Sequence, residues 1–378
     1  MRSRHSFCLW TDRTVRSAAG AHAEDESTAA GDRTAGSPPL VGSTASSKGG
    51  IVVRSVIVGT GSAVPGKVLT NQEMESLVET SDDWIFTRSG IRQRYIASNG
   101  ESTSSLATEA ARAALEMAGV KPDELDMIVV GTTTPDYPLP NTAALVQRNL
   151  GARSAFTFDL YAACSGFLYG ITIADKFIKE KHDRKILVIG AEVLSSITNW
   201  KDRSTCVLFG DAAGAAVVTG GCGGDRGILS THLHSDGNLW QLLYIPGGGC
   251  LNPLTPEMLA QGEHCIHMQG NEVFKHSILA LTEVAREALE ANKIGPEQVD
   301  LFIPHQANVR IIKMVAERLQ IPMDRVYVNL DRYGNTSAAS IPVALDEVNR
   351  SGRVKGGDVV LLDAFGAGFT WGAVMMRW

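Results

Sequence analysis

The chain lacks the cysteine pattern of a metal site or of a disulfide framework. Its six cysteines stand singly along 378 residues, and no Cys-x-x-Cys pair occurs. Scattered single cysteines are typical of proteins from a reducing compartment, in which thiols stay free. We therefore expect neither disulfides nor a bound metal ion.

The sequence also has no long apolar run and no excess of basic residues. A membrane-spanning helix needs about 18 consecutive apolar residues, and no such run is present. The formal net charge of −6 gives no support for nucleic-acid binding, although an acidic protein can still carry a local basic patch. With 44% hydrophobic and 20% charged residues, the composition is that of a globular protein.

The first fifty residues differ from the rest in composition. The segment AHAEDESTAAGDRTAGSPPLVGSTASSKGG is nearly free of large apolar side chains, so it cannot bury enough surface to order itself. Four arginines in the first twenty residues resemble a transit peptide, but the acids at positions 24–26 and 32 argue against one. We expect a disordered extension over residues 1–50 and a cytoplasmic protein, with a plastid protein as the alternative.

From residue 51 onward, apolar strands alternate with amphipathic helices, which predicts a layered α/β fold. The pattern occurs twice, because residues 108–134 align without gaps on residues 282–308, each as helix, proline turn, aspartate and strand. The same offset aligns the strands KILVIGAE and VVLLDAFG. Two halves of one topology, which we place at residues 51–224 and 225–378, predict a shared site where their loops meet.

Cys164 lies in YAACSGF, between an expected strand (FTFDL) and an expected helix (SGFLYGITIADKF). A free cysteine among apolar residues is most often inert packing. At a helix N-terminus, however, unpaired backbone N–H groups and the helix dipole lower the pKa of a thiol and favour the thiolate. The sequence therefore leaves two interpretations of Cys164, a core residue or a nucleophile. The other five cysteines lack this context.

Three features of the second half also follow expected strands. His305 follows an apolar run in DLFIPHQAN, Asn335 lies in a Gly-Asn turn in LDRYGNTSAASIP, and DAFGAGFTWG contains a glycine-rich turn. Each alone is most simply structural, as a core histidine, a turn or N-cap asparagine, and a turn without the GxGxxG phosphate motif. Their common position at strand ends favours one shared site with Cys164.

A cysteine, a histidine, an asparagine and an open backbone loop are suited to acyl-thioester chemistry. The thiolate attacks an acyl thioester, and backbone N–H groups hold the oxyanion. The His and the Asn donate hydrogen bonds to a second thioester carbonyl, which gains enolate charge when CO2 leaves. A papain-like protease uses the same residue types, but a CGSCW-like signature is absent near Cys164.

From about Arg54 to Trp378 the chain resembles the thiolase superfamily, and in particular the β-ketoacyl-acyl carrier protein synthase III family. The resemblance rests on GTGSAVP, TSDDWIFTRSGIRQR, AACSGF, FGDAAGAAV, MQGNEVFK, PHQAN, GNTSAAS and GAGFTWG. PHQANVRI together with GNTSAAS is similar to the initiating synthases, whereas the elongating ones have two histidines. The family implies a five-layered α-β-α-β-α sandwich of two duplicated halves.

The resemblance implies the initiating condensation of type II fatty acid synthesis, in which a short acyl group, acetyl by default, moves from coenzyme A to Cys164. Malonyl-acyl carrier protein then loses CO2 and attacks this group, which gives a 3-oxoacyl-acyl carrier protein. His305 and Asn335 would stabilise the enolate, and the backbone N–H groups of Cys164 and Ala367 would hold the oxyanion. Coenzyme A is then a substrate, so no cofactor is expected. The alternatives are a condensing enzyme of specialised metabolism and a non-enzymatic scaffold.

The same motifs imply a binding site for coenzyme A. Trp84 and Arg203 would sandwich its adenine, Thr80 and Arg88 would lie near its phosphates, and Asn308 would lie along the pantetheine tunnel. All five residues occur within the matching motifs or beside them.

Arg310, with Lys313 as a helper, would dock the acidic carrier protein, and Leu139 and Phe274 would border the acyl pocket. Leu139 departs from many relatives, which carry a Phe that reaches across a homodimer into the partner's pocket. Ala367 replaces a common glycine but keeps the backbone N–H.

Overall fold

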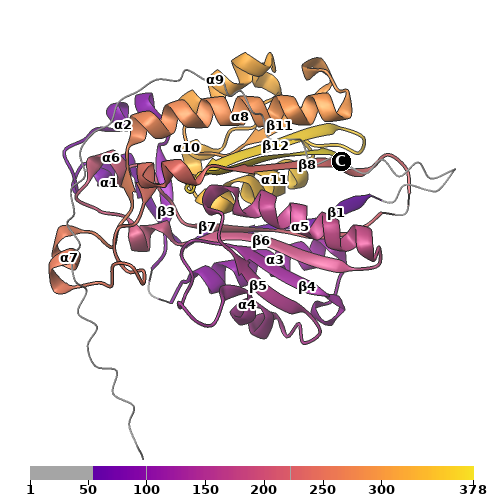
Figure 1. Ribbon diagram of the computed structural model, residues 1–378, viewed down its shortest axis with the longest axis horizontal. Helices are drawn as coiled ribbons and strands as arrows, with labels where there is room; N and C mark the ends of the chain where they lie inside the picture. Colours follow the sequence, from indigo (N-terminus) through magenta and orange to yellow (C-terminus); the bar gives the residue numbers. More distant parts are fainter. Residues whose placement is uncertain (1–53, 99, 222) are drawn as a thin grey trace, which may run out of the picture. The chain divides into compact units, whose positions relative to one another are not determined.

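The computed structural model describes residues 54–98, 100–221 and 223–378 (Figure 1). The extension expected over residues 1–50 lies outside the described residues. Two large β-sheets and three helical layers alternate in the described part, with a helical layer between these sheets and one on the outer face of each (Figure 1). This arrangement confirms the five-layered α-β-α-β-α fold.

The first sheet comes from the first half of the chain. Its strand order is β1-β7-β6-β4-β5, in which β4 runs parallel to β5 and β6, and β7 is antiparallel to β1 and β6. The strands are β1 (Ser55–Ala63), β4 (Met127–Gly131), β5 (Phe156–Leu160), β6 (Lys185–Glu192) and β7 (Ala212–Gly220).

The second sheet comes from the second half, with the order β11-β12-β13-β8. Only β11 and β12 are parallel, and the other two pairs are antiparallel. Its strands are β8 (Gly227–Ser235), β11 (Leu301–Pro304), β12 (Val359–Gly366) and β13 (Thr370–Arg377).

Alternating apolar side chains along the strands produce the layers. In β4, Met127 and Val129 pack against the central helices, whereas Ile128 and Val130 pack against the outer ones. Because both faces of each sheet are covered, the strands are apolar almost throughout. The central helices are α5 (Gly166–Glu180) and α11 (Ser340–Arg350), and the outer ones are α3 (Thr103–Ala118), α4 (Thr142–Leu150), α8 (Gly270–Asn292) and α9 (Val309–Leu319).

The duplicated sequence pattern corresponds to duplicated contacts. Asp126 accepts a hydrogen bond from the backbone N–H of Lys185 at 2.8 Å, and Asp300 accepts one from Val359 at 2.8 Å. Each aspartate thereby ties the start of one strand to the start of its parallel neighbour. The first sheet ends at Gly220 and the second begins at Gly227, so each sheet is built from one sequence repeat.

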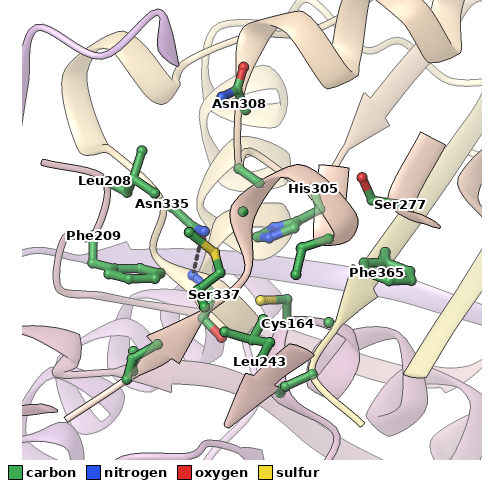
Figure 2. Close-up of a pocket in the computed structure, with 18 of the residues that line it drawn as sticks. Cys164, Leu208, Phe209, Leu243, Ser277, His305, Asn308, Asn335, Ser337 and Phe365 are labelled. Carbon is green, nitrogen blue, oxygen red and sulfur yellow. Dashed lines mark hydrogen bonds between the residues drawn. The ribbon is translucent and has the colours of Figure 1, made fainter. Parts of the chain in front are cut away.

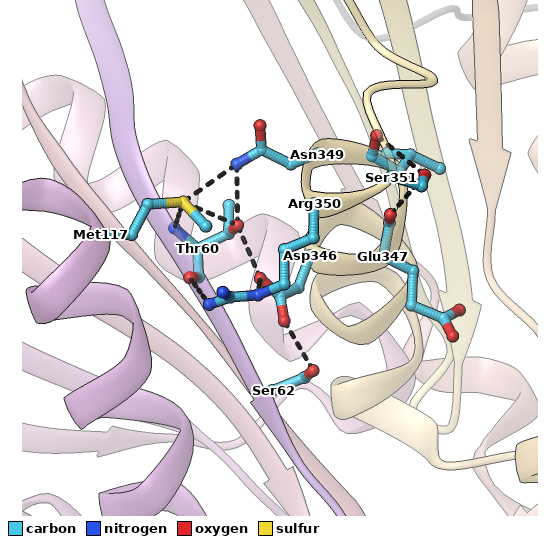
Figure 3. A network of polar contacts seen from close by, with 9 residues as sticks. Thr60, Ser62, Met117, Asp346, Glu347, Asn349, Arg350 and Ser351 are labelled. Carbon is cyan, nitrogen blue, oxygen red and sulfur yellow. Dashed lines mark hydrogen bonds and ion pairs between the residues drawn. The ribbon is translucent and has the colours of Figure 1, made fainter.

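A polar network joins the two halves on one side of the central layer (Figure 3). Asp346 on α11 is buried and accepts hydrogen bonds from Thr60 at 2.8 Å, Ser62 at 2.7 Å and Arg350 at 2.8 Å. Asn349 donates to Thr60 and to the sulfur of Met117 on α3. These bonds fix α11 of the second half against β1 of the first.

Shorter elements complete the described part of the chain. They are the pair β2 (Lys67–Thr70) and β3 (Gln93–Ile96), the pair β9 (Leu243–Tyr244) and β10 (His267–Met268), and the helices α1 (Asn71–Met74), α2 (Asp82–Ser89), α6 (Arg203–Cys206), α7 (Pro256–Gln261) and α10 (Leu330–Tyr333). Across residues 54–378 with their two gaps, no helix has both the length and the apolar character needed to cross a bilayer.

Candidate active site

A cavity of about 780 Å3 brings Cys164, His305 and Asn335 together (Figure 2). Cys164 comes from the first half, and the other two residues come from the second. Ala367, from the loop between β12 and β13, lines the same cavity. The structure thus places the four residues that were expected to share a site around one space.

Cys164 lies in a tight turn between β5 and α5, as its sequence context predicted. Its neighbour Ala163 has a left-handed backbone with φ of 44°, a costly conformation for a residue with a Cβ that is typical of functional sites. Two hydrogen bonds hold the turn against β13. Ser165 donates to the carbonyl of Thr370 at 3.0 Å, and the hydroxyl of Thr370 donates to the carbonyl of Ala162 at 2.9 Å.

The helix that follows Cys164 has no side-chain cap at its N-terminus. Its first backbone N–H groups therefore remain without a side-chain acceptor at the end nearest the thiol. Such groups stabilise negative charge that develops beside them.

The expectation that the pKa of the Cys164 thiol is lowered at this helix terminus is wrong in the net direction of the shift. Burial raises the pKa of Cys164 to about 12, against a weaker opposing effect of a hydrogen bond with Ser337, and the carboxyl group of Glu192 raises it further. Cys164 keeps part of its accessible surface where it lines the cavity, and the protein atoms around the thiol disfavour its charged form. Desolvation outweighs the helix terminus, and the cysteine is a neutral thiol at neutral pH.

His305 follows β11 and is buried, with its backbone N–H bonded to the carbonyl of Asp363 at 2.8 Å. Its Nδ1 atom lies 2.6 Å from the hydroxyl of Ser340, and that hydroxyl accepts the backbone N–H of Gln306 at 3.4 Å. When the Ser340 hydroxyl donates its proton to Nδ1, the neutral ring carries its own proton on Nε2. Burial lowers the pKa of His305 to about 4, so the ring is neutral at pH 7 and can donate from Nε2.

Asn335 is held on both sides by backbone bonds. Its N–H donates to the carbonyl of Leu208 at 2.8 Å, and its carbonyl accepts from Gly210 at 3.0 Å. The side-chain oxygen Oδ1 accepts the backbone N–H of Ser337 at 2.9 Å (Figure 2). The amide NH2 group is therefore the end of Asn335 that remains to donate to a substrate.

Polar and aromatic side chains surround the outer part of the cavity. Trp84 and the exposed Arg88 line it, and the guanidinium of Arg88 lies 4.6 Å from the centre of the Trp84 ring. Arg203 lies 4.9 Å from the same ring and donates to the carbonyl of Glu79 at 2.8 Å. Asn308 links two elements here, because it donates to the carbonyl of Arg88 at 3.0 Å and caps α9.

Arg310, at the start of α9, lines the cavity and lies 5.3 Å from the ring of Phe274, which also lines it. Four other expected site residues do not line the cavity. They are Thr80, Leu139, Arg203 and Lys313. Leu139 is 86% exposed and projects away from the protein.

Four residues near the reactive centre were not identified from the sequence. Ser337 and Ser340 position Asn335 and His305, and both lie in the GNTSAAS motif. Glu192 is buried behind Cys164, and Gly366 allows the backbone of Cys164 to approach β12. In the described part of the chain, no group of three or more His, Cys, Asp or Glu side chains could hold a metal ion.

Comparison with known protein families agrees with the family resemblance that the sequence motifs indicated. Family models described as 3-oxoacyl-[acyl-carrier-protein (ACP)] synthase III and as its C-terminal part match residues 158–237 and 289–378. A protein of Caldanaerobacter subterraneus named beta-ketoacyl-[acyl-carrier-protein] synthase III is 52% identical over 322 residues, which are 85% of this chain and 97% of the relative. A protein of Xylella fastidiosa with the same name is 52% identical over 324 residues, 85% of this chain and 98% of the relative.

Solved structures agree with the sequence relatives. The 3-oxoacyl-[acyl-carrier-protein] synthase III of Aquifex aeolicus superposes with a TM-score of 0.80 at 48% identity, over 86% of this chain and all of that chain. A priming β-ketosynthase from the R1128 polyketide pathway superposes with a TM-score of 0.78 at 34% identity, over 86% of this chain and 96% of that chain. The chain therefore belongs to the 3-oxoacyl-[acyl-carrier-protein] synthase III family, which consists of acyltransferases that act as condensing enzymes.

Proposed function

We propose that this protein catalyses the initiating condensation of fatty acid synthesis, with a short acyl-coenzyme A as primer and malonyl-acyl carrier protein as extender. The observation that carries this proposal is the convergence of Cys164, His305 and Asn335 on one cavity whose lining also includes Ala367. Two relatives at 52% identity are named beta-ketoacyl-[acyl-carrier-protein] synthase III, which favours this function over a role in specialised metabolism.

In the first step, the sulfur of Cys164 attacks the thioester carbonyl of the primer. The carbonyl oxygen becomes negative in the tetrahedral intermediate, and the backbone N–H groups of Cys164 and Ala367 donate to it. Coenzyme A leaves as a thiolate, and the acyl group remains on Cys164 as a thioester.

In the second step, the malonyl thioester carbonyl accepts hydrogen bonds from Nε2 of His305 and from the amide of Asn335. Loss of CO2 places negative charge on this oxygen as an enolate. Because both donors are neutral and already oriented by Ser340 and Ser337, they need little reorganisation as the charge develops. The enolate carbon attacks the acyl group, and Cys164 leaves.

Incubation with a panel of acyl-coenzyme A thioesters, followed by intact-protein mass measurement and peptide mapping, tests the first step. One acyl group should map to Cys164 and be absent from Cys164→Ala. Cys250→Ala is the matched control, because Cys250 is a free, exposed cysteine outside the cavity. Acylation elsewhere, or an unchanged rate of product formation by Cys164→Ala, would contradict the proposal.

For substrate binding, we propose that coenzyme A occupies the outer part of the cavity. Trp84 and Arg203 would hold the adenine, which requires Arg203 to move off the ring on which it now lies. Arg88 and Thr80 would face the phosphates, and Asn308 would face the pantetheine. The hydroxyl oxygen of Thr80 has no hydrogen-bond partner among the described residues, but it is buried and does not line the cavity, so it has to become exposed before it can contact a phosphate.

We further propose that the acidic carrier protein docks at Arg310 and Lys313, which are both exposed on α9. Arg310 joins this surface to the cavity, because its side chain also lines the cavity beside Phe274. A carrier protein bound there would deliver its substrate arm toward Cys164.

A homodimer formed at β5 is the quaternary structure that we propose. β5 is an edge strand, so one of its sides has backbone groups without a neighbouring strand. Exposed apolar side chains surround this edge, with Phe156 at 46%, Tyr161 at 74% and Leu139 at 86% exposure. Pairing of two β5 edges would cover these side chains.

We propose the cytoplasm as the location of the protein. The free thiols of the described part are compatible with this reducing compartment.

A further inference from the structure

Glu347 on α11 is a carboxylate that accepts hydrogen bonds from several residues between His305 and Asn335. Its side chain is 19% exposed, and its donors all lie within residues 327–333. They are Tyr327 at 3.2 Å, Asn329 at 2.6 Å, Arg332 at 2.6 and 3.0 Å and Tyr333 at 2.8 Å. Neither Glu347 nor any of these donors lines the cavity, and the reaction steps above do not use them.

One branch of this cluster leads to the turn that carries His305. The side-chain amide of Asn329 donates to Glu347, and its backbone N–H donates to Oε1 of Gln306 at 3.0 Å. The amide NH2 group of Gln306 donates to two backbone carbonyls, at 2.7 and 3.1 Å, so this side chain is held at three points. Gln306 directly follows His305, and both residues are buried. Glu347 thereby holds, through Asn329, the residue next to the catalytic histidine.

The other branch leads to the turn that carries Asn335. Arg332 and Tyr333 are the last two residues of α10, and both donate to Glu347. Only Gly334, with φ of 69°, separates α10 from the asparagine. The place at which the chain enters the Asn335 turn is therefore set by how α10 is anchored on Glu347.

α11 connects the two branches, because it also contacts His305 directly. Ser340, the first residue of α11, lies 2.6 Å from Nδ1 of His305. Glu347 lies seven residues further along, which is about two turns, so the two side chains share one face of the helix. Figure 3 shows Glu347 pointing away from Asp346 and the network that ties α11 to β1. One face of α11 thus contacts both the His305 turn and α10.

The chemistry of Glu347 suits it to fix a geometry. Burial raises its pKa, but the hydrogen bonds from Arg332, Asn329 and Tyr333 lower it by more, so the group is a carboxylate at neutral pH. A carboxylate only accepts hydrogen bonds, and its two oxygens have room for several donors at once. Hydrogen bonds to an ionised group are shorter and stronger than neutral ones, which agrees with the 2.6 Å bonds from Asn329 and Arg332.

We propose that Glu347 is a positioning residue for the condensation step, in which it sets the separation and direction of two donors. These donors are Nε2 of His305 and the amide of Asn335, which have to meet at one carbonyl oxygen. A misplacement of about 1 Å can lower a rate about 10²-fold. Glu347 touches neither donor and acts through the turns that carry them. Its hydrogen bonds within the described residues do not reach the turn of Cys164, so acyl transfer to the thiol does not depend on it.

Separate measurement of the two steps tests this proposal. Acylation of Cys164 by an acyl-coenzyme A is followed by intact-protein mass, and condensation is followed as product formed from the acylated enzyme and saturating malonyl-acyl carrier protein. Glu347→Gln keeps the shape of the side chain but turns an NH2 group toward donors. Its condensation kcat should fall at least about tenfold, with acylation unchanged. Unchanged condensation would overturn the proposal, and so would a parallel loss of both steps, because that is the result of a purely structural role.

Two further variants accompany this measurement. Tyr333→Phe removes one donor to Glu347 but keeps the ring that stacks on Tyr95 with centroids 5.6 Å apart, so it tests the proposal even if Glu347→Gln does not fold. It should lower condensation alone, by a smaller factor, and an unchanged condensation rate would overturn the proposal.

Glu287→Gln is the matched control. Glu287 is also a carboxylate that joins a helix to another element through side-chain bonds, with His232 at 2.9 Å and His234 at 2.6 Å on β8. None of these three residues lines the cavity. Both steps should keep their wild-type rates, and a loss of condensation equal to that of Glu347→Gln would overturn the specific role.

A double-mutant cycle shows whether Glu347 acts through Asn335. Substitutions of residues that act through one another have non-additive effects. In Asn335→Ala the amide that Glu347 positions is already absent, so addition of Glu347→Gln should lower condensation by a smaller factor than it does in the wild type. Equal factors in the two backgrounds would overturn the proposal.

This inference rests on the condensation proposed above, and the two can fail separately. A wild type that forms no 3-oxoacyl product would contradict the proposed function and this inference with it. A wild type that performs both steps, together with a Glu347→Gln variant that performs them equally well, would contradict only the positioning role.

Discussion

The backbone of Cys164 lies directly against Gly366. A Cβ added at residue 366 would stand 2.6 Å from the backbone nitrogen of Cys164 and 3.1 Å from its Cβ. This contact crosses from the nucleophile turn of the first half to the end of β12 in the second. It sets the position of the nucleophile relative to the loop that carries Ala367.

Gly366→Ala should therefore lower acyl transfer to Cys164 and destabilise the fold by about 1–3 kcal/mol through overpacking. Gly356→Ala is the control, because a Cβ there meets no atom within 4 Å. Acylation rates and denaturant unfolding of both variants check this prediction. Equal acylation by Gly366→Ala and the wild type would show that the close approach is not required.

Asn335→Ala should separate the two steps of the reaction. The variant removes one donor to the enolate, and loss of one such donor typically lowers a rate about 10²–10³-fold. Condensation should fall by this factor, whereas acylation of Cys164 should persist because Asn335 does not bind the first oxyanion. Asn349→Ala, in the network of Figure 3, should leave both steps unchanged. A parallel loss of acylation would contradict the separate role.

His305 should make folding stability depend on pH in acid. Its pKa is about 4 in the folded state against 6.5 ordinarily, because burial disfavours the charged ring. Between these values the unfolded chain binds more protons, so stability is full above pH 6.5 and falls as the pH drops toward 4. The loss amounts to about 3 kcal/mol from this residue.

Denaturant unfolding of the wild type and of His305→Gln at pH 7 and pH 4.5 measures this effect. Carboxyl groups that titrate in this range change the free energy of unfolding of both proteins by the same amount. The difference between the two free energies therefore reports the effect of the histidine alone. The destabilisation caused by His305→Gln should be smaller at pH 4.5 than at pH 7. The same destabilisation at both values would mean that His305 titrates normally.

Sequence patterns located the reactive residues but not their electrostatics. Strand ends and the internal repeat were sufficient to bring Cys164, His305 and the loop of Ala367 together, because parallel strands of one topology place their following loops at one edge. The expectation that Asn335 also follows a strand is wrong, because it follows the short helix α10. The pKa of Cys164 was predicted in the wrong direction, since desolvation depends on how deeply the whole fold encloses the thiol. Glu192 gave no signal, because an acid at the end of an apolar strand is indistinguishable in sequence from an exposed one.

Arg310→Glu should weaken the use of malonyl-acyl carrier protein. Reversal of an exposed charge opposite an acidic partner should raise the KM about tenfold at low salt, and the effect should shrink as salt screens the charges. Arg318→Glu is a control on the same helix, because Arg318 does not line the cavity. The KM measured at two ionic strengths checks this, and an equal effect of both substitutions would argue against a specific docking site.

Leu139→Phe should restrict the primer to shorter acyl chains, although Leu139 lies outside the cavity of its own chain. Leu139 is 86% exposed, so a larger side chain at this position has no effect within its own chain. It can act only if a dimer brings it against the acyl pocket of the second copy. Leu251→Phe is a matched control, because Leu251 is 84% exposed and also lies outside the cavity. One methylene in an apolar pocket changes the binding free energy of a substrate by about 1–3 kcal/mol. The preference for acetyl over hexanoyl primers should therefore rise at least tenfold in Leu139→Phe and stay unchanged in Leu251→Phe. Unchanged primer ratios in a variant that remains dimeric would remove Leu139 from the acyl pocket, whereas the expected shift would require the dimer that the β5 edge predicts.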